Sequence, residues 1–475
     1  MKQKCSIVAL NMESKKNMNK QANELVKEND LILLTIKRLG INGEGIGYFK
    51  RLAIFVADAL PEEVVEVKIT KTTEKYAYGI VNKVKKTSSK RITPACPYYG
   101  KCGGCQLQHI DYQEQLRQKK LMILETFERY YQGDYSHVIF NDTIGMEDPW
   151  NYRNKTQLPV RHDGENVVVG MYAADSNKVV YIDNCLVENK LISEKMKLIL
   201  EFLSKSSIDV YNPRFRQGNL RYIVLRGFEE TGEVQATFVL MEKEPRLIGI
   251  LKKVGSYANL TSVNYSINSD PKAIEIISSP VYKLTGTDRI KGKLSDLEFI
   301  ISPDSFFQLN TKQTIILYEE IKKIINPTGK EKILDCYCGI GSIGLYLAKS
   351  VDEVRGIDNN ESNIINAREF AKLNNINNAK FYHGNITPHL QDFSKENFNP
   401  DVLIIDPPRR GMDLNVINYL QKSKIKKIVY VSCNPSTLVK NLNHLQKAYI
   451  VRSVSPVDMF PNTANVECVV CLERR

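Results

Sequence analysis

The chain has 475 residues, of which 66 are lysine or arginine and 54 are aspartate or glutamate, so its formal net charge is +12. The composition is ordinary for a globular protein, and there is neither a low-complexity tract nor an apolar run long enough to span a membrane, which excludes fibrous, disordered and helical membrane proteins. The length allows two to four domains, and the basic excess favours an anionic partner such as RNA or DNA.

The first 22 residues are polar and basic, and we expect them to form a flexible N-terminal segment. An apolar run at residues 5–10 follows Lys2 and Lys4, but it is too short for a signal peptide and no small-residue cleavage site comes after it. We therefore expect a cytoplasmic protein with no membrane association. The ten cysteines then indicate reduced thiols, metal ligands or catalytic groups rather than disulfides.

Residues 23–84 have the pattern of a small β-barrel of the OB type, a fold that commonly binds nucleic acid. Its short β-rich segments are residues 31–36, 40–48, 53–56, 64–69 and 77–81. Basic residues crowd the last third of this domain and the residues just after it, against only Glu66 and Glu74. The cluster favours an RNA-binding surface, although a solvated basic edge strand would give the same pattern.

Residues 85–304 are predicted to form a mixed α+β central domain, with a helix near residues 113–131 and strands near 178–182 and 234–240. The domain opens with three cysteines within ten residues, and a fourth follows much later. They are Cys96, Cys102, Cys105 and Cys185. Four thiolates suit an iron–sulfur cluster or a structural zinc ion, and unliganded thiols are the remaining alternative.

Residues 305–475 alternate apolar strands with helical segments, which predicts a doubly wound α/β sheet. A helical segment around residues 315–325 leads into a strand at residues 332–335. The strands that follow are expected to end at Asp358, Asn385, Asp406 and Cys433, and two more lie near residues 449–454 and 466–472. In such a sheet ligands bind at the carboxyl ends of the strands, so these polar side chains mark the expected site.

A glycine-rich turn follows the first of these strands. Gly339 and Gly341 would let a ligand approach the backbone closely, and Asp358 can accept hydrogen bonds from ribose hydroxyls. NAD enzymes share this pattern, but a carboxylate at Asp335 suits the cationic amino-acid part of S-adenosylmethionine and would repel a pyrophosphate. The turn therefore favours S-adenosylmethionine, and Asn385 is assigned to the same site.

A reactive thiol is expected at Cys433, between a strand and Asn434-Pro435. A thiolate there could attack C6 of a uracil ring, so that C5 becomes nucleophilic enough to take a methyl group. A base must then remove the C5 proton, and Glu467 is the candidate. Gln308 and Asp406 would orient the ring and the cofactor.

Residues 406–437 resemble the signature of the RNA (uracil-5-)-methyltransferase family. The resemblance implies that Cys433 is the nucleophile and Glu467 the proton acceptor. It also implies that S-adenosylmethionine contacts Gln308, Tyr337, Asp358 and Asp406. The N-terminal barrel is similar to the TRAM domain of that family, and residues 152–157 resemble a segment that touches RNA through Arg153, Lys155 and Gln157.

The same resemblance implies a 4Fe-4S cluster on the four cysteines, with zinc as the alternative, and structured RNA, specifically 23S rRNA, as the substrate. A tRNA substrate and an RNA-binding protein with an inactive methyltransferase fold are the alternative interpretations.

The chain departs from the family at two positions. The family usually has His or Gln where Asn462 stands, and His where Asn465 stands. Asparagine cannot carry charge near neutral pH, which puts the environment of Glu467 in question. No protein partner is implied, and we expect a monomer.

Overall fold

The structure, a computed structural model, describes residues 25–475 except residues 175, 274 and 397, so the expected flexible segment 1–22 lies outside the described residues. The chain forms two compact units. One comprises Met1–Met122 with Asn462–Asn465, and the other Ile123–Pro461 with Val466–Arg475. The division falls inside helix α3 (Tyr112–Tyr130), close to the helix expected at residues 113–131. None of the helices described is both long and apolar enough to cross a bilayer.

The first unit contains a closed five-stranded barrel in the order β1-β2-β3-β5-β4, which confirms the predicted OB-like fold. Its strands are β1 (Leu31–Leu39), β2 (Gly45–Phe49), β3 (Leu52–Ala57), β4 (Val64–Thr72) and β5 (Tyr76–Lys86). Alternate residues such as Ile54, Val67 and Ala77 are fully buried inside the barrel, as the period of two in a strand requires. Gly45 allows close packing, because a Cβ there would lie 2.5 Å from the carbonyl oxygen of Ala59.

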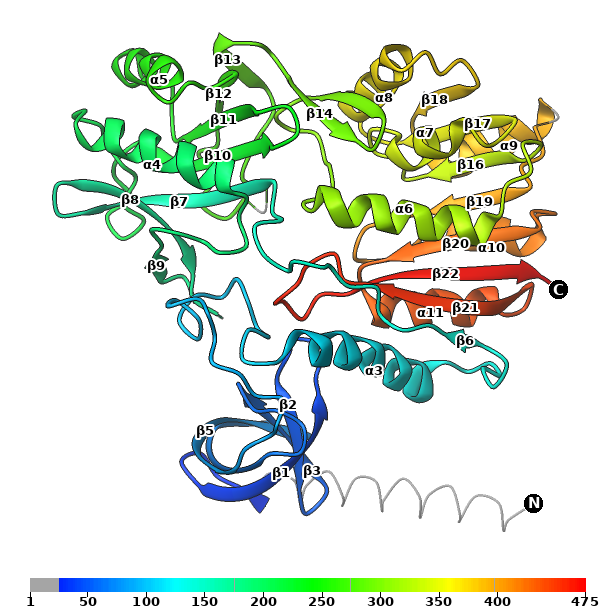
Figure 1. Ribbon diagram of the computed structural model, residues 1–475, viewed down its shortest axis with the longest axis horizontal. Helices are drawn as coiled ribbons and strands as arrows, with labels where there is room; N and C mark the ends of the chain where they lie inside the picture. Colours follow the sequence, from blue (N-terminus) through cyan, green and yellow to red (C-terminus); the bar gives the residue numbers. More distant parts are fainter. Residues whose placement is uncertain (1–24, 175, 274, 397) are drawn as a thin grey trace, which may run out of the picture. The chain divides into compact units, whose positions relative to one another are not determined.

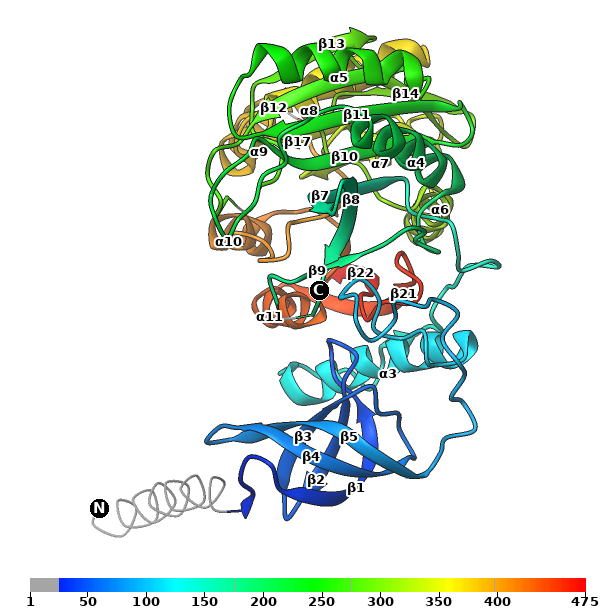
Figure 2. The ribbon, with the colours of Figure 1, turned by 90° about the vertical axis from the view of Figure 1, so that its left-hand side faces the viewer.

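The second unit begins with a central seven-stranded sheet in the order β13-β12-β11-β10-β7-β8-β9. These strands are β7 (Lys155–Asp163), β8 (Asn166–Tyr172), β9 (Val179–Tyr181), β10 (Leu220–Phe228), β11 (Glu233–Leu240), β12 (Ser262–Ile267) and β13 (Val281–Gly286). Helices α4 (Lys190–Ser204) and α5 (Pro245–Tyr257) pack on the sheet through one apolar core (Figure 2). This is the mixed α+β arrangement that the sequence predicts, and a hairpin of β14 (Ile290–Leu294) and β15 (Leu297–Ile301) follows it.

An eight-stranded sheet forms the rest of the unit, in the order β18-β17-β16-β19-β20-β22-β21-β6 (Figure 1). The strands are β6 (Ile139–Phe140), β16 (Lys332–Cys336), β17 (Glu353–Asp358), β18 (Ala379–His383), β19 (Val402–Ile405), β20 (Lys427–Ser432), β21 (Tyr449–Val457) and β22 (Glu467–Arg474). Strands β16 to β20 are parallel, but β22 runs antiparallel to β20 and to β21. The sheet is therefore mixed at one end rather than parallel throughout.

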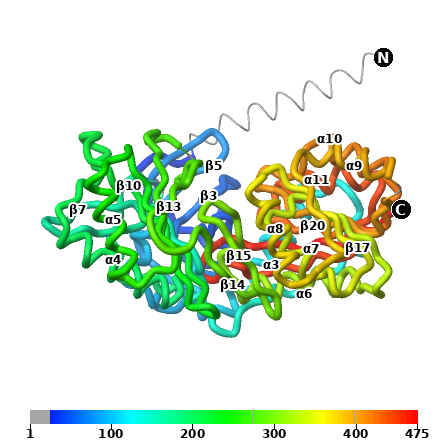
Figure 3. Tube along the Cα trace, turned by 90° about the horizontal axis from the view of Figure 1, so that it is seen from above, coloured from blue at the N-terminus to red at the C-terminus, as the bar shows by residue number. Residues whose placement is uncertain are grey.

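Helices cover both faces of this sheet, so the fold is doubly wound as predicted (Figure 3). They are α6 (Thr311–Ile325), α7 (Ser342–Ala348), α8 (Glu361–Leu373), α9 (Ile386–Lys395), α10 (Leu414–Lys422) and α11 (Pro435–Leu445). Successive residues of one strand supply the two cores: Ile333 packs with α6, α7 and α8, and Leu334 packs with α9, α10 and α11. A strand buried on both faces in this way is apolar at nearly every position.

Candidate active site

The candidate catalytic residues meet at one edge of the eight-stranded sheet. The parallel strands β19 and β20 end there, and each is followed at once by a reactive side chain, Asp406 and Cys433 respectively. Strand β22 is antiparallel and therefore begins at the same edge, with Glu467 as its first residue. Because Ser432 pairs with Cys468, the next residue along β20 lies beside Glu467. Thiol and carboxylate are thus neighbours across two strands.

The backbone around Cys433 is held by a helix cap. The Asn434 side chain accepts hydrogen bonds from the backbone N–H groups of Ser436 (3.1 Å) and Thr437 (3.4 Å), which starts helix α11 immediately after the thiol. The carbonyl oxygen of Arg409 accepts hydrogen bonds from Asn434 Nδ2 (3.3 Å) and Thr437 Oγ1 (3.1 Å). The loop after β19 is therefore fixed to the loop that carries Cys433.

A second anchor for this loop is Asn441 on helix α11. Its Oδ1 accepts hydrogen bonds from Tyr430 Oη (2.7 Å) and from the backbone N–H of Met412 (2.9 Å). Gly411 has a φ of +84°, and a Cβ there would lie 2.5 Å from Asn441 Oδ1. Only glycine fits this position without displacing the anchor.

Burial disfavours the ionised forms of Cys433, Glu467 and Asp406, and repulsion by neighbouring acidic groups adds to this effect at Cys433 and Glu467. Burial, together with the charges of Glu467 and Asp406, raises the pKa of Cys433 to about 11, while Arg409 opposes the shift. Burial and Asp406 raise the pKa of Glu467 to about 8, again opposed by Arg409. Burial raises the pKa of Asp406 to about 7. Arg409 is thus the cation that favours the ionised forms of both the thiol and the carboxylate.

The glycine-rich turn after β16 lies at the same edge. The backbone N–H of Gly339 donates to Asp358 Oδ2 (2.9 Å), and Asp358 Oδ1 accepts from the N–H of Asn360 (2.9 Å). Tyr337 has a φ of +62°, a conformation that is strained for a residue other than glycine. Gly341, the N-cap residue of helix α7, has a φ of +73°, and a Cβ there would lie 2.5 Å from the ring of Phe381. The turn therefore cannot carry larger side chains at this glycine.

Two buried polar atoms beside the turn lack a hydrogen-bond partner among the described residues: Asp335 Oδ1 and the Tyr337 hydroxyl. The other carboxylate oxygen of Asp335 accepts from the N–H of Gly344 (3.1 Å). Burial, aided by the charges of Asp406 and Asp358, raises the pKa of Asp335 to about 8. Buried polar groups are normally satisfied, so these two atoms fit a polar, cationic ligand such as S-adenosylmethionine.

Asn385 does not end a strand as the sequence predicts. Strand β18 ends at His383, and Asn385 instead takes the N-cap position of helix α9 without making a side-chain cap bond. Its side chain is exposed. The turn at Gly384, with a φ of +138°, separates the strand from the helix.

Gln308 lies in a loop that two other elements hold in place. Its carbonyl oxygen accepts from Asn154 Nδ2 (2.9 Å). The buried guanidinium of Arg226 on β10 donates to the carbonyl oxygens of Ser302 (3.1 Å) and Ser305 (2.6 Å). Arg226 therefore fixes the backbone just before Gln308.

The three predicted RNA contacts, Arg153, Lys155 and Gln157, share one half-buried side of the segment that enters β7. Arg153 Nε donates to the carbonyl oxygen of Lys155 (2.9 Å). Burial, together with the guanidinium groups of Arg226 and Arg153, lowers the pKa of Lys155 to about 7. This lysine is therefore only partly charged at neutral pH until an anion approaches it.

Comparison with known proteins agrees with this geometry. Residues 284–475 match the tRNA (uracil-5-)-methyltransferase family, and residues 26–81 match the TRAM domain. An uncharacterized RNA methyltransferase of Bacillus cereus is 42% identical, over 93% of this chain and 96% of its own length. The chain belongs to the RNA (uracil-5-)-methyltransferase family.

Two further likenesses extend over nearly the whole chain. An uncharacterized RNA methyltransferase of Halalkalibacterium halodurans is 41% identical, over 96% of this chain and 99% of its own. The structure of Pyrococcus abyssi tRNA (uracil-54, C5)-methyltransferase in complex with S-adenosyl-L-homocysteine is 28% identical, with a TM-score of 0.73, over 93% of this chain and 99% of that one. The predicted family, fold class, enzyme class and use of S-adenosylmethionine are confirmed.

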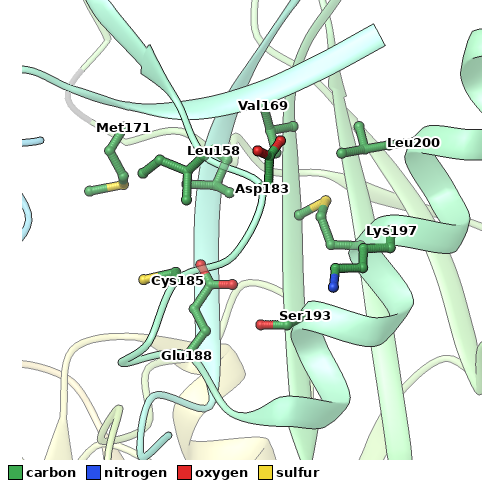
Figure 4. Close-up of a pocket in the computed structure, with 11 residues that line it drawn as sticks. Leu158, Val169, Met171, Asp183, Cys185, Glu188, Ser193, Lys197 and Leu200 are labelled. Carbon is green, nitrogen blue, oxygen red and sulfur yellow. The ribbon is translucent and has the colours of Figure 1, made fainter. Parts of the chain in front are cut away.

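The predicted metal ligands of this methyltransferase divide between the two units. Cys96, Cys102 and Cys105 belong to the first unit, whereas Cys185 belongs to the second. In the second unit, Cys185 lines a pocket with Glu188, and the further lining residues include Leu158, Met171, Ser193 and Lys197 (Figure 4). No group of three or more His, Cys, Asp or Glu among the described residues is placed to hold a metal ion.

The departures from the family at Asn462 and Asn465 have structural roles in the first unit. Asn462 is buried, its Oδ1 accepts from Gln115 Nε2 (3.2 Å), and its N–H donates to Gln115 Oε1 (3.1 Å). Its carbonyl oxygen accepts from the N–H groups of Gln106 (3.1 Å) and Leu107 (2.9 Å). Asn465 is exposed, and its side chain donates to Thr463 Oγ1 (3.3 Å). Neither asparagine is among the groups that shift the pKa of Glu467.

Sequence reasoning gave no role to Arg226, Arg409 or Asn441. Arg409 and Asn441 lie in or beside the family signature, so a basic residue next to the two prolines could have been read as a partner for the thiol. Arg226 sits in an apolar strand segment far from the signature, and only its burial against residues 302–305 reveals it. A positive charge inside a strand is the signal that such a residue leaves in a sequence.

Proposed function

We propose that this methyltransferase uses S-adenosylmethionine to methylate C5 of specific uridines in 23S rRNA, giving 5-methyluridine through a covalent bond between Cys433 and the uracil ring. The observation that carries the proposal is the placement of Cys433 beside Glu467 at the carboxyl edge of the parallel strands. The orphaned oxygen of Asp335 supports a cationic cofactor at the same edge.

The proposed reaction begins with the thiolate of Cys433. Its sulfur forms a bond to C6 of uracil, and the electron pair of the C5–C6 double bond moves to give an enolate whose carbon C5 is nucleophilic. S-adenosylmethionine would supply the methyl group as an electrophile to C5 and would leave as S-adenosylhomocysteine. Glu467 then removes the proton from C5, the double bond forms again, and the sulfur leaves C6 as a thiolate. The nucleophile is regenerated, and the methyl group replaces one proton.

The pKa shifts in the site support a separate role for Arg409 and for Glu467. Arg409 lowers the pKa of Cys433 against the opposite effects of burial and of the charges of Glu467 and Asp406, and the resulting pKa is about 11. Glu467, with a pKa of about 8, is close to the range that suits a group that must accept a proton and later release it. Closing the site over a flipped uracil would exclude water and strengthen both effects.

The residues proposed to hold S-adenosylmethionine surround the glycine-rich turn and the strand ends beside it. They are Gln308, Asp335, Tyr337, Gly339, Gly341, Asp358, Asn385 and Asp406. The N–H of Gly339 donates to Asp358 Oδ2 and so helps to fix the carboxylate that is proposed to accept hydrogen bonds from the ribose hydroxyls. The Tyr337 hydroxyl and Asp335 Oδ1 are the polar atoms that the ligand would satisfy.

The RNA is proposed to lie along the barrel and against Arg153, Lys155 and Gln157. An anion beside Lys155 would raise its pKa from about 7, so RNA binding is expected to take up protons at neutral pH. A tRNA substrate is the second candidate, because the Pyrococcus abyssi enzyme acts on tRNA uracil-54 and is 28% identical to this chain. Mapping 5-methyluridine by mass spectrometry in 23S rRNA and tRNA from a deletion strain separates the two. Loss from tRNA alone would overturn the 23S rRNA proposal, and loss from neither would favour an inactive RNA-binding protein.

The metal site is proposed from the four cysteines together with the family resemblance: Cys96, Cys102, Cys105 and Cys185 would hold a 4Fe-4S cluster, with zinc as the alternative. All four side chains are half-buried, and the N–H of Gly104 donates to Cys102 Sγ (3.3 Å), as backbone amides do toward thiolates in iron–sulfur sites. No step of the methyl transfer depends on it. Iron and sulfide analysis of protein purified without oxygen tests the proposal, and stoichiometric zinc without iron would replace it. A cytoplasmic location and a monomeric state complete the proposal.

A further inference from the structure

A short turn precedes Gln308, and the serines at its two ends bond to the same side chain. The turn closes where the N–H of Ser305 donates to the carbonyl oxygen of Ser302 (3.2 Å). Asn366 on helix α8 contacts both ends, since its Nδ2 donates to Ser305 Oγ (2.7 Å) and its Oδ1 accepts from Ser302 Oγ (3.3 Å). Asn366 therefore holds the two hydroxyls of the turn, while Arg226 holds its two carbonyl oxygens.

Asn366 occupies the middle of α8, where asparagine is a poor helix former. Only 1% of the residue is exposed, and a buried amide is stable in such a place only when it is hydrogen-bonded. Its Nδ2 also donates to the carbonyl oxygen of Ser362, one turn earlier in the same helix (2.8 Å). This bond orients the amide, and the two others connect it to the turn.

The same helix also holds the other side of the proposed cofactor site. Asn363 lies three residues before Asn366, and residues at that spacing lie on the same side of a helix. Its Nδ2 donates to Asp358 Oδ1 (3.1 Å), which belongs to the carboxylate proposed to bind ribose hydroxyls. Two asparagines on one side of α8 thus connect Asp358, at the end of β17, with the turn that precedes Gln308.

The turn is close enough to Gln308 to affect its position. Three steps along the chain lead from Ser305 to Gln308, a reach of about 10 Å at most. Asn154 also holds the carbonyl oxygen of Gln308 (2.9 Å), so the loop would keep one anchor if the turn came loose. Loss of the bonds from Asn366 should therefore loosen Gln308 rather than unfold the loop.

We propose that Asn366 is a positioning residue for S-adenosylmethionine: by fixing Ser302 and Ser305, it sets the place of Gln308 relative to Asp358. It acts through the turn and not by touching the cofactor. The inference rests on the proposed binding of the cofactor by Gln308 and Asp358. A ligand that meets an ordered loop does not have to order it, so the gain is in cofactor affinity.

The test is binding of S-adenosyl-L-homocysteine to the full-length protein without RNA, measured by calorimetry well below the melting temperature. Asn366→Ala is expected to weaken binding about 2- to 10-fold, because the ligand must then order a turn that has lost its hydrogen bonds. Ser305→Ala removes one of these bonds and leaves α8 unchanged, so it tests the same contact if Asn366→Ala does not fold. The two replacements together should weaken binding no more than Asn366→Ala alone.

Steady-state kinetics gives a second measurement. In Asn366→Ala the KM for S-adenosylmethionine should rise by the same factor, while the KM for RNA should stay within about twofold of the wild type. A defect of the whole fold would change both constants. Equal changes in the two would therefore overturn the inference.

Asn374→Ala is the matched control, because Asn374 caps the same helix and also connects α8 to the chain before the turn. Its Nδ2 donates to the carbonyl oxygen of Glu298 (2.6 Å), and its Oδ1 accepts from the N–H of Glu298 (3.0 Å). This variant should lower the melting temperature but bind S-adenosyl-L-homocysteine as the wild type does. Equal weakening of binding in Asn374→Ala and Asn366→Ala, or none in a folded Asn366→Ala, would overturn the inference.

Gln308→Ala separates failure of this inference from failure of the proposed site. If Asn366 acts through Gln308, then Asn366→Ala should have no further effect on binding once Gln308 is alanine. A full additional effect in that background would overturn the inference. Normal binding in Gln308→Ala would remove Gln308 from the cofactor site, and the inference with it. Normal binding in Asn366→Ala, with weakened binding in Gln308→Ala, would leave the site standing and overturn the inference alone.

Discussion

Replacement of Glu467 by glutamine separates the two halves of the proposed reaction. Glutamine has nearly the same shape as glutamate but cannot accept the C5 proton, so Cys433 should still bond to C6 and C5 should still be methylated. The elimination that releases the RNA should slow by about 10²- to 10⁴-fold, the usual contribution of a general base. A covalent species that joins the protein to methylated RNA should therefore accumulate and survive denaturation.

The pKa of Glu467 gives this prediction a pH dependence. With a pKa of about 8, about 1% of Glu467 is ionised at pH 6 and half at pH 8, so an elimination that needs the carboxylate should speed up about 50-fold across that range. Glu467→Gln should lose this rise. Denaturing gels of reactions with methyl-labelled cofactor, followed over time at each pH, measure both the adduct and its decay.

Two variants control this experiment. Glu473→Gln changes the same residue type near the other end of β22, where Glu473 pairs with Arg452 at the surface (2.8 Å), and should behave as wild type. The double replacement of Cys433→Ala and Glu467→Gln should form no adduct. Normal turnover in Glu467→Gln, with no trapped species, would show that another group removes the proton.

Three further predictions follow from the same site. Cys433→Ala should abolish both adduct formation and methyl transfer while leaving cofactor binding intact, as measured by calorimetry; residual transfer would rule out the covalent route. Arg409→Ala should raise the pKa of the Cys433 thiol and slow its alkylation by iodoacetamide several-fold, whereas Arg410→Ala should not, and equal rates in the two would remove Arg409 from thiolate stabilisation. Asp335→Asn should flatten the pH dependence of stability. The folded protein keeps a proton on Asp335 up to a pKa of about 8, while the unfolded chain releases it near 3.8, so wild-type stability falls as pH rises between these values, by at most about 6 kcal/mol. Melting temperatures at pH 5 and pH 8 measure the difference, and identical slopes for both proteins would contradict it.

Local patterns in the sequence were sufficient for the fold class. Alternation of apolar and polar residues indicates the barrel strands, and continuous apolar runs followed by polar residues indicate the strands of the eight-stranded sheet. Both patterns can be recognised in the sequence because each reflects which residues of a single strand are buried. The signature at residues 406–437 and the glycines after β16 likewise carry their chemistry locally. The predicted end of a strand at Asn385 was wrong, since the turn at Gly384 ends β18 two residues earlier and starts helix α9. The domain limits and the roles of the site residues stay predictions.

The sequence alone determined that Asp406 and Cys433 follow the strands β19 and β20, and the tertiary structure decided which polar side chains meet at the ends of the strands. Cys433 and Glu467 are 34 positions apart, and nothing local fixes their distance. They are neighbours because β22 inserts antiparallel beside β20, so that the start of one strand adjoins the end of the other. The raised pKa values of Asp335, Asp406 and Glu467 also depend on the tertiary structure, because the burial of all three, and the repulsion by other carboxylates at Asp335 and Glu467, exist only once the strands are assembled.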